Sequence, residues 1–181
     1  IAITMLGCTA TVVKPAKVKN PQSVQVMSSQ NSDGALTTKT IEKAFDAVGL
    51  TVGANNDMNN PFGQRFPTLH YKVYNLAVFS NTELSFKLIK KYPHFGALMP
   101  LTMSIWSDKE TMNVATLTLD GMSRAGKIPI NDPDLIAYAA MITKALNAAM
   151  PKGALKELNH TVKDPQDSYA IDFVAEIDTE E

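Results

Sequence analysis

Two arginines are the side chains of this sequence best suited to recognising a small anion. Arg65 follows Phe62-Gly63-Gln64, and Arg124 lies within Gly121-Met122-Ser123-Arg124-Ala125-Gly126, so each stands close to glycine in an expected loop. The planar guanidinium group binds carboxylates and phosphates through paired hydrogen bonds. If the two loops meet in space, Arg65 and Arg124 form a ligand-binding site. The commoner alternative is that both are solvated loop charges.

The histidines and methionines offer a metal-based interpretation. None of His70, His94 and His160 has a second ligand type at metal-ligand spacing, so we predict no metal site and no cofactor. His94 nevertheless lies close to Met99 and Met103, and thioethers select copper(I). The alternative function is a periplasmic redox or metal accessory protein that binds haem or copper through His94, His70 and methionines. Core packing explains the methionines better.

No group of residues has a spacing typical of an enzyme. The chain lacks a Gly-x-Ser-x-Gly elbow and a Gly-rich phosphate loop. Asp132 and Asp134 form a carboxylate pair, but they stand at an expected helix start, where the helix dipole accounts for them. We therefore predict no catalytic residue and a protein that is not an enzyme.

The lone cysteine, Cys8, stands in a context suited to lipid attachment. The residues before it are mostly apolar, and Gly7 is a small residue directly before the thiol, as in the lipobox of a bacterial lipoprotein. Leu6 departs from that pattern, because Ala or Ser is commoner there. We expect residues 1–8 to be the remnant of a lipoprotein signal that ends at Cys8. The alternative is a short buried strand with a core cysteine.

Residues 9–21 have the composition of a flexible tether. This segment contains Lys14, Lys17 and Lys19, two prolines and no acid, so it is poorly suited to a helix or a central strand. Its lysines could touch anionic head groups. Thr9 follows the cysteine where enteric bacteria place an aspartate to retain lipoproteins in the inner membrane. We therefore expect a periplasm-facing lipoprotein, on the outer membrane rather than the inner.

The composition indicates one ordinary globular domain. The 181 residues include 17 basic and 18 acidic side chains, which give a net charge of −1, so the positive footprint of a nucleic-acid-binding protein is missing. No apolar run approaches the roughly 18 residues needed to cross a bilayer. We expect residues 22–181 to form a single domain whose C-terminal extension, from Asp164 onward, is acidic.

Alternation of polar and apolar residues predicts the strands. The expected strands are residues 23–28, 50–52, 69–79, 101–105, 112–119 and 169–174. Residues 101–119 form a hairpin around a polar turn. The apolar face of its second strand changes from Met112 and Val114 to Leu117 and Leu119, which predicts a β-bulge near Ala115.

Helix signals separate these strands. A staple between Leu36 and Ile41 marks the first helix. The predicted helices begin after the N-cap Thr37, within the capping box Ser80-Asn81-Thr82-Glu83, and at Pro133 after the N-cap Asp132; they end at Gly49, at Tyr92 and near Pro151. Residues 55–67 and 120–130 are predicted loops. The order β-α-β-β-α-β-β-α, with an extra strand, favours a two-layer α+β domain with a mostly antiparallel sheet and helices on one face.

Three segments resemble the domain-of-unknown-function 302 family. They are residues 75–81, Asn-Leu-Ala-Val-Phe-Ser-Asn; residues 87–93, from Lys-Leu-Ile to Tyr-Pro; and residues 97–101, Ala-Leu-Met-Pro-Leu. Order, spacing and helix lengths agree from Val24 to Met150. Thr82 and Gly121 stand where family members often carry proline. The resemblance implies a saddle-like α+β fold similar to that of the TATA-binding protein, and homodimers. It implies no DNA binding, since fold similarity does not transfer function.

The sequence therefore predicts a membrane-tethered lipoprotein domain of a Gram-negative-like cell envelope. It is expected to be non-enzymatic and to bind a small ligand or an envelope protein. The lipid on Cys8 would hold it to the membrane.

Overall fold

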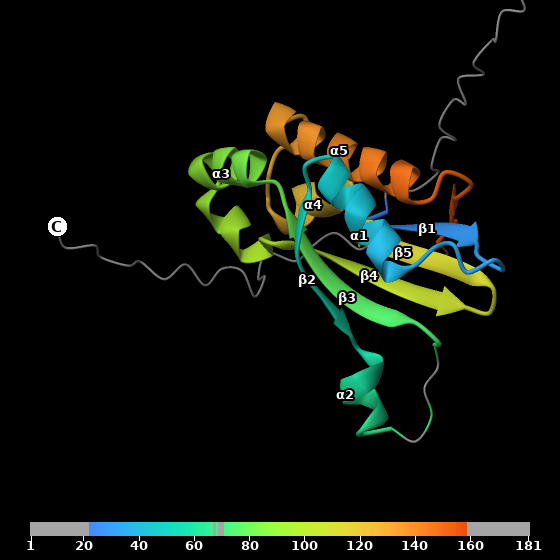
Figure 1. Cartoon of the computed structure of the whole chain (residues 1–181). Coiled ribbons are helices and arrows are strands. Elements are labelled where there is room, and N and C mark those ends of the chain that lie inside the picture. Colours follow the sequence, from blue (N-terminus) through green and yellow to red (C-terminus); the bar gives the residue numbers. More distant parts are fainter. Residues whose placement is uncertain (1–21, 67, 69–70, 159–181) are drawn as a thin grey trace, which may run out of the picture.

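The computed structural model describes residues 22–66, 68 and 71–158, and Figure 1 shows how their elements are arranged. In this part of the chain the strands form one six-stranded antiparallel sheet in the order β2-β3-β4-β5-β1-β6. The strands are β1 (Val24–Gln30), β2 (Thr51–Asp57), β3 (Tyr74–Ser80), β4 (Leu101–Asp108), β5 (Thr111–Leu117) and β6 (Ala154–Leu155). The helices are α1 (Thr38–Ala47), α2 (Asn59–Gly63), α3 (Thr82–Lys91), the 3₁₀ helix η1 (Pro93–Leu98), α4 (Leu119–Ala125) and α5 (Pro133–Ala149).

The core lies between the sheet and the helices that cover one of its faces. From α1, Ile41 and Phe45 are completely buried, and the Phe45 ring meets the Phe79 ring edge-on with centroids 5.1 Å apart. The pleat presents alternate strand residues to this face. The buried strand and α5 residues of the core include Met27, Ala77, Phe79, Leu101, Met103, Ile105, Met112, Val114, Leu135, Tyr138, Ile142 and Leu146. The α+β prediction, with helices on one side of an antiparallel sheet, is confirmed.

Two helix starts are where the sequence places them. Thr37 caps α1 in a capping box: its hydroxyl accepts the Thr40 N–H at 3.1 Å, and the Thr40 hydroxyl accepts the Thr37 N–H at 2.9 Å. Asp132 caps α5, which begins at Pro133. Both caps satisfy backbone donors that the first helical turn leaves without partners.

The start of α3 differs by one residue from the prediction. Its N-cap is Asn81, whose side-chain oxygen accepts the Leu84 N–H at 2.9 Å. Ser80 does not cap the helix because it still belongs to β3, where it pairs with Thr51 of β2. The strand therefore continues one residue further than the capping-box pattern implies.

The β-bulge predicted near Ala115 was wrong. β5 keeps an unbroken register with both β4 and β1. The buried face continues into Thr116, a polar residue whose hydroxyl accepts a hydrogen bond from Gln25 Nε2 at 3.2 Å. Leu117 therefore falls on the opposite face without any bulge. The sheet's register shift lies instead in β2, between Val52 and Ala54.

Both segments predicted as loops contain helices. β2 extends to Asp57 rather than ending near Val52, and α2 follows it within residues 55–67. α4 occupies most of residues 120–130, because the Thr118 hydroxyl accepts the Gly121 N–H at 2.9 Å and so caps a new helix. The glycines in these two segments therefore did not indicate loops throughout.

Several predictions fall outside the described residues. These are Cys8, the tether 9–21, residues 69–70 of the predicted strand 69–79 and the predicted strand 169–174. Residues 71–73 are described but lie outside the sheet, since β3 begins only at Tyr74. β6 pairs with β1, where Met27 faces Leu155. Among the described residues, no helix combines the length and apolar character needed to span a bilayer.

Candidate functional site

The two arginines lie at opposite ends of the sheet. β2 and β5 run in opposite directions, since each of the three neighbouring pairs from β2 to β5 is antiparallel. Arg65 follows α2, beyond the end of β2, whereas Arg124 lies on α4, beyond the end of β5 (Figure 1). Arg124 Nε donates to Asp120 Oδ2 at 2.8 Å, and Arg65 is exposed. The condition for a joint anion site, that the two loops meet, is therefore not fulfilled.

The described residues of the metal-based alternative have other partners in the fold. A ring nitrogen of His94 is hydrogen-bonded to the carbonyl oxygen of Gly126. Met103 is completely buried in the core, and Met99 Sδ accepts the Ser85 hydroxyl at 3.3 Å. His70 and His160 lie outside the described residues. No three His, Cys, Asp or Glu side chains gather into a possible metal site within the described ranges.

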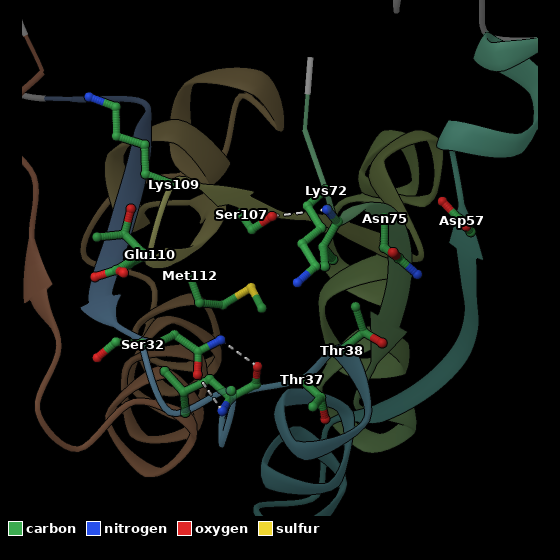
Figure 2. A pocket seen from close by; sticks show the side chains of 15 residues that line it. Ser32, Thr37, Thr38, Asp57, Lys72, Asn75, Ser107, Lys109, Glu110 and Met112 are labelled. Carbon is green, nitrogen blue, oxygen red and sulfur yellow. Dashed lines mark hydrogen bonds between the residues drawn. The ribbon is translucent and has the colours of Figure 1, made fainter. Parts of the chain in front are cut away.

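A polar cavity of about 530 Å³ lies beside the start of α1 (Figure 2). Four segments that are distant in sequence surround it: the β1–α1 loop, the end of β2, the entry to β3 and the β4–β5 turn. Its side chains are mostly short hydroxyls, amides and charged groups. The lining residues used below are Asn31, Thr37, Thr38, Asp57, Lys72, Val73, Asn75, Ser107, Lys109, Glu110 and Met112.

Asn31 shapes the β1–α1 loop that forms one wall. Its side-chain oxygen accepts the Leu36 N–H at 2.7 Å, and its side-chain nitrogen donates to the Leu36 carbonyl at 2.8 Å. The Asn31 N–H donates to the carbonyl of Glu110 in the β4–β5 turn at 2.6 Å. Gly34 has a φ of +67°, a conformation that glycine adopts without steric cost. The Asn31 side chain thus fixes the conformation of the β1–α1 loop. The Asn31 backbone N–H joins this loop to the β4–β5 turn.

The opposite wall is held by Ser107 and Val73. The Ser107 N–H donates to the Val73 carbonyl at 3.0 Å, and the Val73 N–H donates to the Ser107 hydroxyl at 2.9 Å. These bonds lie just before the first ladder pair of β3 and β4, Tyr74 with Trp106. They fix the backbone beside Lys72, the cationic side chain of this wall.

The charged side chains around the cavity differ in where they point and in which partners they have. Figure 2 shows the Lys72 side chain extending into the cavity and that of Lys109 extending away from it. Within the described part of the chain, Lys72 has no carboxylate at ion-pair distance. Asp57 Oδ1 accepts the Asn59 N–H at 2.9 Å. Lys72 is therefore the cation that an occupant of the cavity would meet, in a lining that also contains the carboxylates of Asp57 and Glu110.

Neutral hydrogen-bonding groups and one thioether complete the cavity. Thr37 and Thr38, at the start of α1, contribute hydroxyls, and Asn75 contributes a side-chain amide that donates to Asn55 Oδ1 at 2.9 Å. Met112, which is only 2% exposed, belongs to the apolar core beneath. This arrangement offers charges of both signs and neutral polar groups above an apolar floor. Such groups can contact a ligand through charge and hydrogen bonding.

Sequence reasoning missed this cavity. It treated the β1–α1 loop and the β4–β5 turn as separate connections and placed Lys72 inside a regular strand. The signal that was available is Asn31, since asparagine can mimic a backbone turn with its side chain. No sequence feature indicated that this loop lies near Lys72. The two come together only through the order of β1, β5, β4 and β3 in the sheet.

Comparison with known proteins supports the fold. A solved structure described as an uncharacterized conserved DUF302 protein from Bacillus stearothermophilus is similar, with a TM-score of 0.52 and 17% sequence identity. The match covers 70% of this chain and 96% of that one. The search of curated proteins found no match. The family model for DUF302, a domain of unknown function, matches residues 25–151, close to the range that the sequence resemblance covered, and the chain therefore belongs to the DUF302 family.

Proposed function

We propose that this chain is a non-catalytic binding domain whose cavity beside α1 takes a small polar ligand with an anionic group. The observation that carries the proposal is Lys72, whose ammonium group extends into the cavity without a carboxylate partner among the described residues. The cavity volume of about 530 Å³ falls within the usual range of ligand pockets, roughly 300–1,000 Å³.

The surrounding groups suit a carboxylate or phosphate. A lysine ammonium binds such a group as a point charge, and hydroxyls and amides add directional hydrogen bonds. The Thr38 hydroxyl and the Asn75 amide lie on the same side as Lys72 (Figure 2). Among the described residues, the lining contains neither histidine nor cysteine.

We further propose that lipid on Cys8 holds this domain to the periplasmic face of a bacterial membrane, the outer membrane rather than the inner. This part rests on the sequence, where Gly7-Cys8 is followed by a lysine-containing tether. A tethered domain would sample ligands in the periplasm without diffusing away from the membrane. Intact mass of protein extracted from its native membrane tests it: we expect the mass gain of acyl groups on Cys8, and an unmodified chain would refute the anchor.

Pairing of two copies also belongs to the proposal. The sheet face opposite the helices carries Leu76, which is 40% exposed, together with partly buried Val24 and Trp106. Apolar side chains gathered on an open sheet face favour an interface. Sedimentation velocity should detect a dimer that Leu76→Glu weakens and Phe86→Glu, on the exposed side of α3, leaves intact. A parent chain that stays monomeric at high concentration would refute pairing.

The ligand-binding proposal is tested by a thermal-shift screen of carboxylates, phosphates and neutral sugars. We expect carboxylate or phosphate compounds to stabilise the parent chain. Lys72→Gln should lose that stabilisation. The matched control is Lys90→Gln, which removes another exposed lysine from α3, outside the cavity. Stabilisation that persists in Lys72→Gln, or a preference for neutral sugars, would overturn the proposed recognition.

A further inference from the structure

Exposed aromatic rings gather beyond the end of the β2–β3 pair. The Phe62 ring stacks on Tyr74 with centroids 5.8 Å apart, Phe66 lies 6.1 Å from Phe62, and Tyr71 lies 5.8 Å from Tyr74. We call these four residues the aromatic cluster. Phe66 is 55% exposed, Tyr71 38% and Phe62 36%, so the rings pack on one another instead of entering the core. Grouped exposed rings of this kind mark an interaction site.

The aromatic cluster projects from the domain. Its Phe62 belongs to α2, which extends past the sheet and away from the helical layer (Figure 1). Exposed rings on such a projection can insert into a soft partner.

The segment that carries the cluster, residues 58–82, is basic. Between Asp57 and Glu83 the sequence contains no acidic residue, and it contains Arg65 and Lys72. Arg65 is exposed beside Phe66. A basic group near exposed aromatic rings is the combination by which peripheral proteins bind anionic membranes, because the cation meets lipid phosphates while the rings enter the interface.

We propose that the aromatic cluster is a membrane contact, which inserts Phe62 and Phe66 into the headgroup–acyl boundary of an anionic bilayer. The tyrosine rings lie beside them with polar hydroxyls, a combination that favours the membrane–water interface. Arg65 binds lipid phosphate. The contact gives a domain held by lipid a second point of attachment and thus a fixed orientation.

The length of the tether allows this contact. β1 and β2 run in the same direction across the sheet, so the chain enters the domain at the end opposite α2. The 15 residues between Cys8 and Val24 span at most about 50 Å when extended. The seven residues of β2 cover only about 23 Å. The inference rests on the proposed function only for the presence of a membrane near the domain.

Vesicle binding tests the contact without the lipid anchor. The full chain with Cys8→Ser is sedimented with vesicles of phosphatidylglycerol and phosphatidylethanolamine, and with vesicles of phosphatidylcholine. We expect preference for the anionic vesicles, and at least about a tenfold loss of affinity in Phe62→Ser/Phe66→Ser, since this double variant removes the apolar area of both rings from the interface. The matched control is Phe86→Ser, which removes a ring that is 66% exposed on α3.

A second measurement locates the ring. Phe66→Trp in a Trp106→Phe background leaves one tryptophan in the chain. Brominated anionic lipids should quench its fluorescence if it enters the bilayer. Circular dichroism and thermal melts establish that each variant is folded.

Three outcomes overturn the inference. Equal vesicle binding by the parent and by Phe62→Ser/Phe66→Ser would assign binding to the lysine tether, and an unquenched tryptophan would show that the ring stays in water. Self-association that the same variant abolishes, without vesicle binding, would identify the cluster as a protein contact. Because every chain in this experiment lacks Cys8, failure of lipidation shows only in the intact mass and leaves these results unaffected.

Discussion

Ser107 and Val73 are joined by a pair of hydrogen bonds, one through the Ser107 N–H at 3.0 Å and one through the Ser107 hydroxyl at 2.9 Å. The hydroxyl accepts a backbone donor just before β3 begins pairing with β4 at Tyr74. The backbone beside Lys72 is thereby fixed in position. The Ser107 side chain, near the end of β4, thus helps to position Lys72, the cation of the cavity.

Ser107→Ala should weaken ligand binding more than it weakens the fold. The substitution leaves the partly buried Val73 N–H without its acceptor, which costs about 1 kcal/mol of unfolding free energy. It also loosens the backbone beside Lys72, so affinity for a carboxylate or phosphate ligand found in the screen should fall several-fold. Calorimetric titration and urea unfolding measure the two effects. Ser104→Ala, in the same strand on the opposite face, should change neither, and equal affinities of Ser107→Ala and the parent would contradict the role.

Short sequence patterns predicted helix starts well where a single capping residue determines them. Thr37 and Asp132 cap helices because their side chains reach backbone donors two or three residues ahead, an interaction contained within a short window. α4 was not predicted because Gly121 follows three residues after its cap, Thr118, and glycine usually indicates a loop. The bulge prediction failed because Thr116 occupies a core position that hydrophobic patterning assigns to an apolar residue.

The cavity depends on contacts that no short window contains. Asn31 contacts the carbonyl of Glu110, and Val73 contacts Ser107, across separations that only the order of the strands specifies. Arg65 and Arg124 attracted attention as residue types, but strand direction places them at opposite ends of the sheet. Residue chemistry could therefore suggest an anion-binding function, whereas the location of the site required the fold.

Tyr138→Phe should destabilise the domain without changing its shape. The Tyr138 ring is completely buried, and its hydroxyl accepts the Asn81 N–H at 2.9 Å, at the N-cap of α3. Burial raises the pKa of this phenol, so it stays protonated at neutral pH. Removing the hydroxyl leaves the Asn81 donor without a partner and should lower the unfolding free energy by about 1–2 kcal/mol in urea melts. Tyr71→Phe, at an exposed ring, is the control, and equal losses in both variants would contradict the assignment.

Gly121→Ala should damage the junction between α4 and β1. A Cβ at Gly121 would lie 1.9 Å from the Ser23 carbonyl oxygen, so the backbone preceding β1 must move. That oxygen also accepts the Thr118 N–H at 3.0 Å, which ties the displacement to the helix cap. We expect a loss of at least about 2 kcal/mol in denaturant unfolding, typical of overpacking. Gly96→Ala, where an added Cβ meets nothing within 4 Å, should lie within about 1 kcal/mol of the parent; similar losses for the two variants would refute the steric explanation.

The Asp132 carboxylate joins the start of α5 to the end of α3. One oxygen accepts the N–H groups of Asp134 at 2.9 Å and Leu135 at 3.1 Å, and the other accepts the Tyr92 hydroxyl at 3.1 Å and Lys91 Nζ at 3.3 Å. Burial opposes ionisation, but the hydrogen bonds from Leu135, Lys91 and Tyr92 outweigh it and hold the pKa of Asp132 below its ordinary value of 3.8.

This shift makes the stability that Asp132 contributes depend on pH. Because the folded-state pKa lies below the unfolded one, the contribution is complete above about pH 4 and is lost as the pH falls through the folded-state pKa. Asp132→Asn keeps a capping oxygen but removes the charge, so it should cost about 1–2 kcal/mol at pH 7, and this difference should shrink below pH 4. Urea melts between pH 7 and pH 2 measure it. Glu83→Gln, which removes an exposed carboxylate paired with Lys87, should cost no more than about 0.5 kcal/mol at pH 7. A gap between parent and Asp132→Asn that stays constant down to pH 2 would mean that the charge of Asp132 does not stabilise the junction.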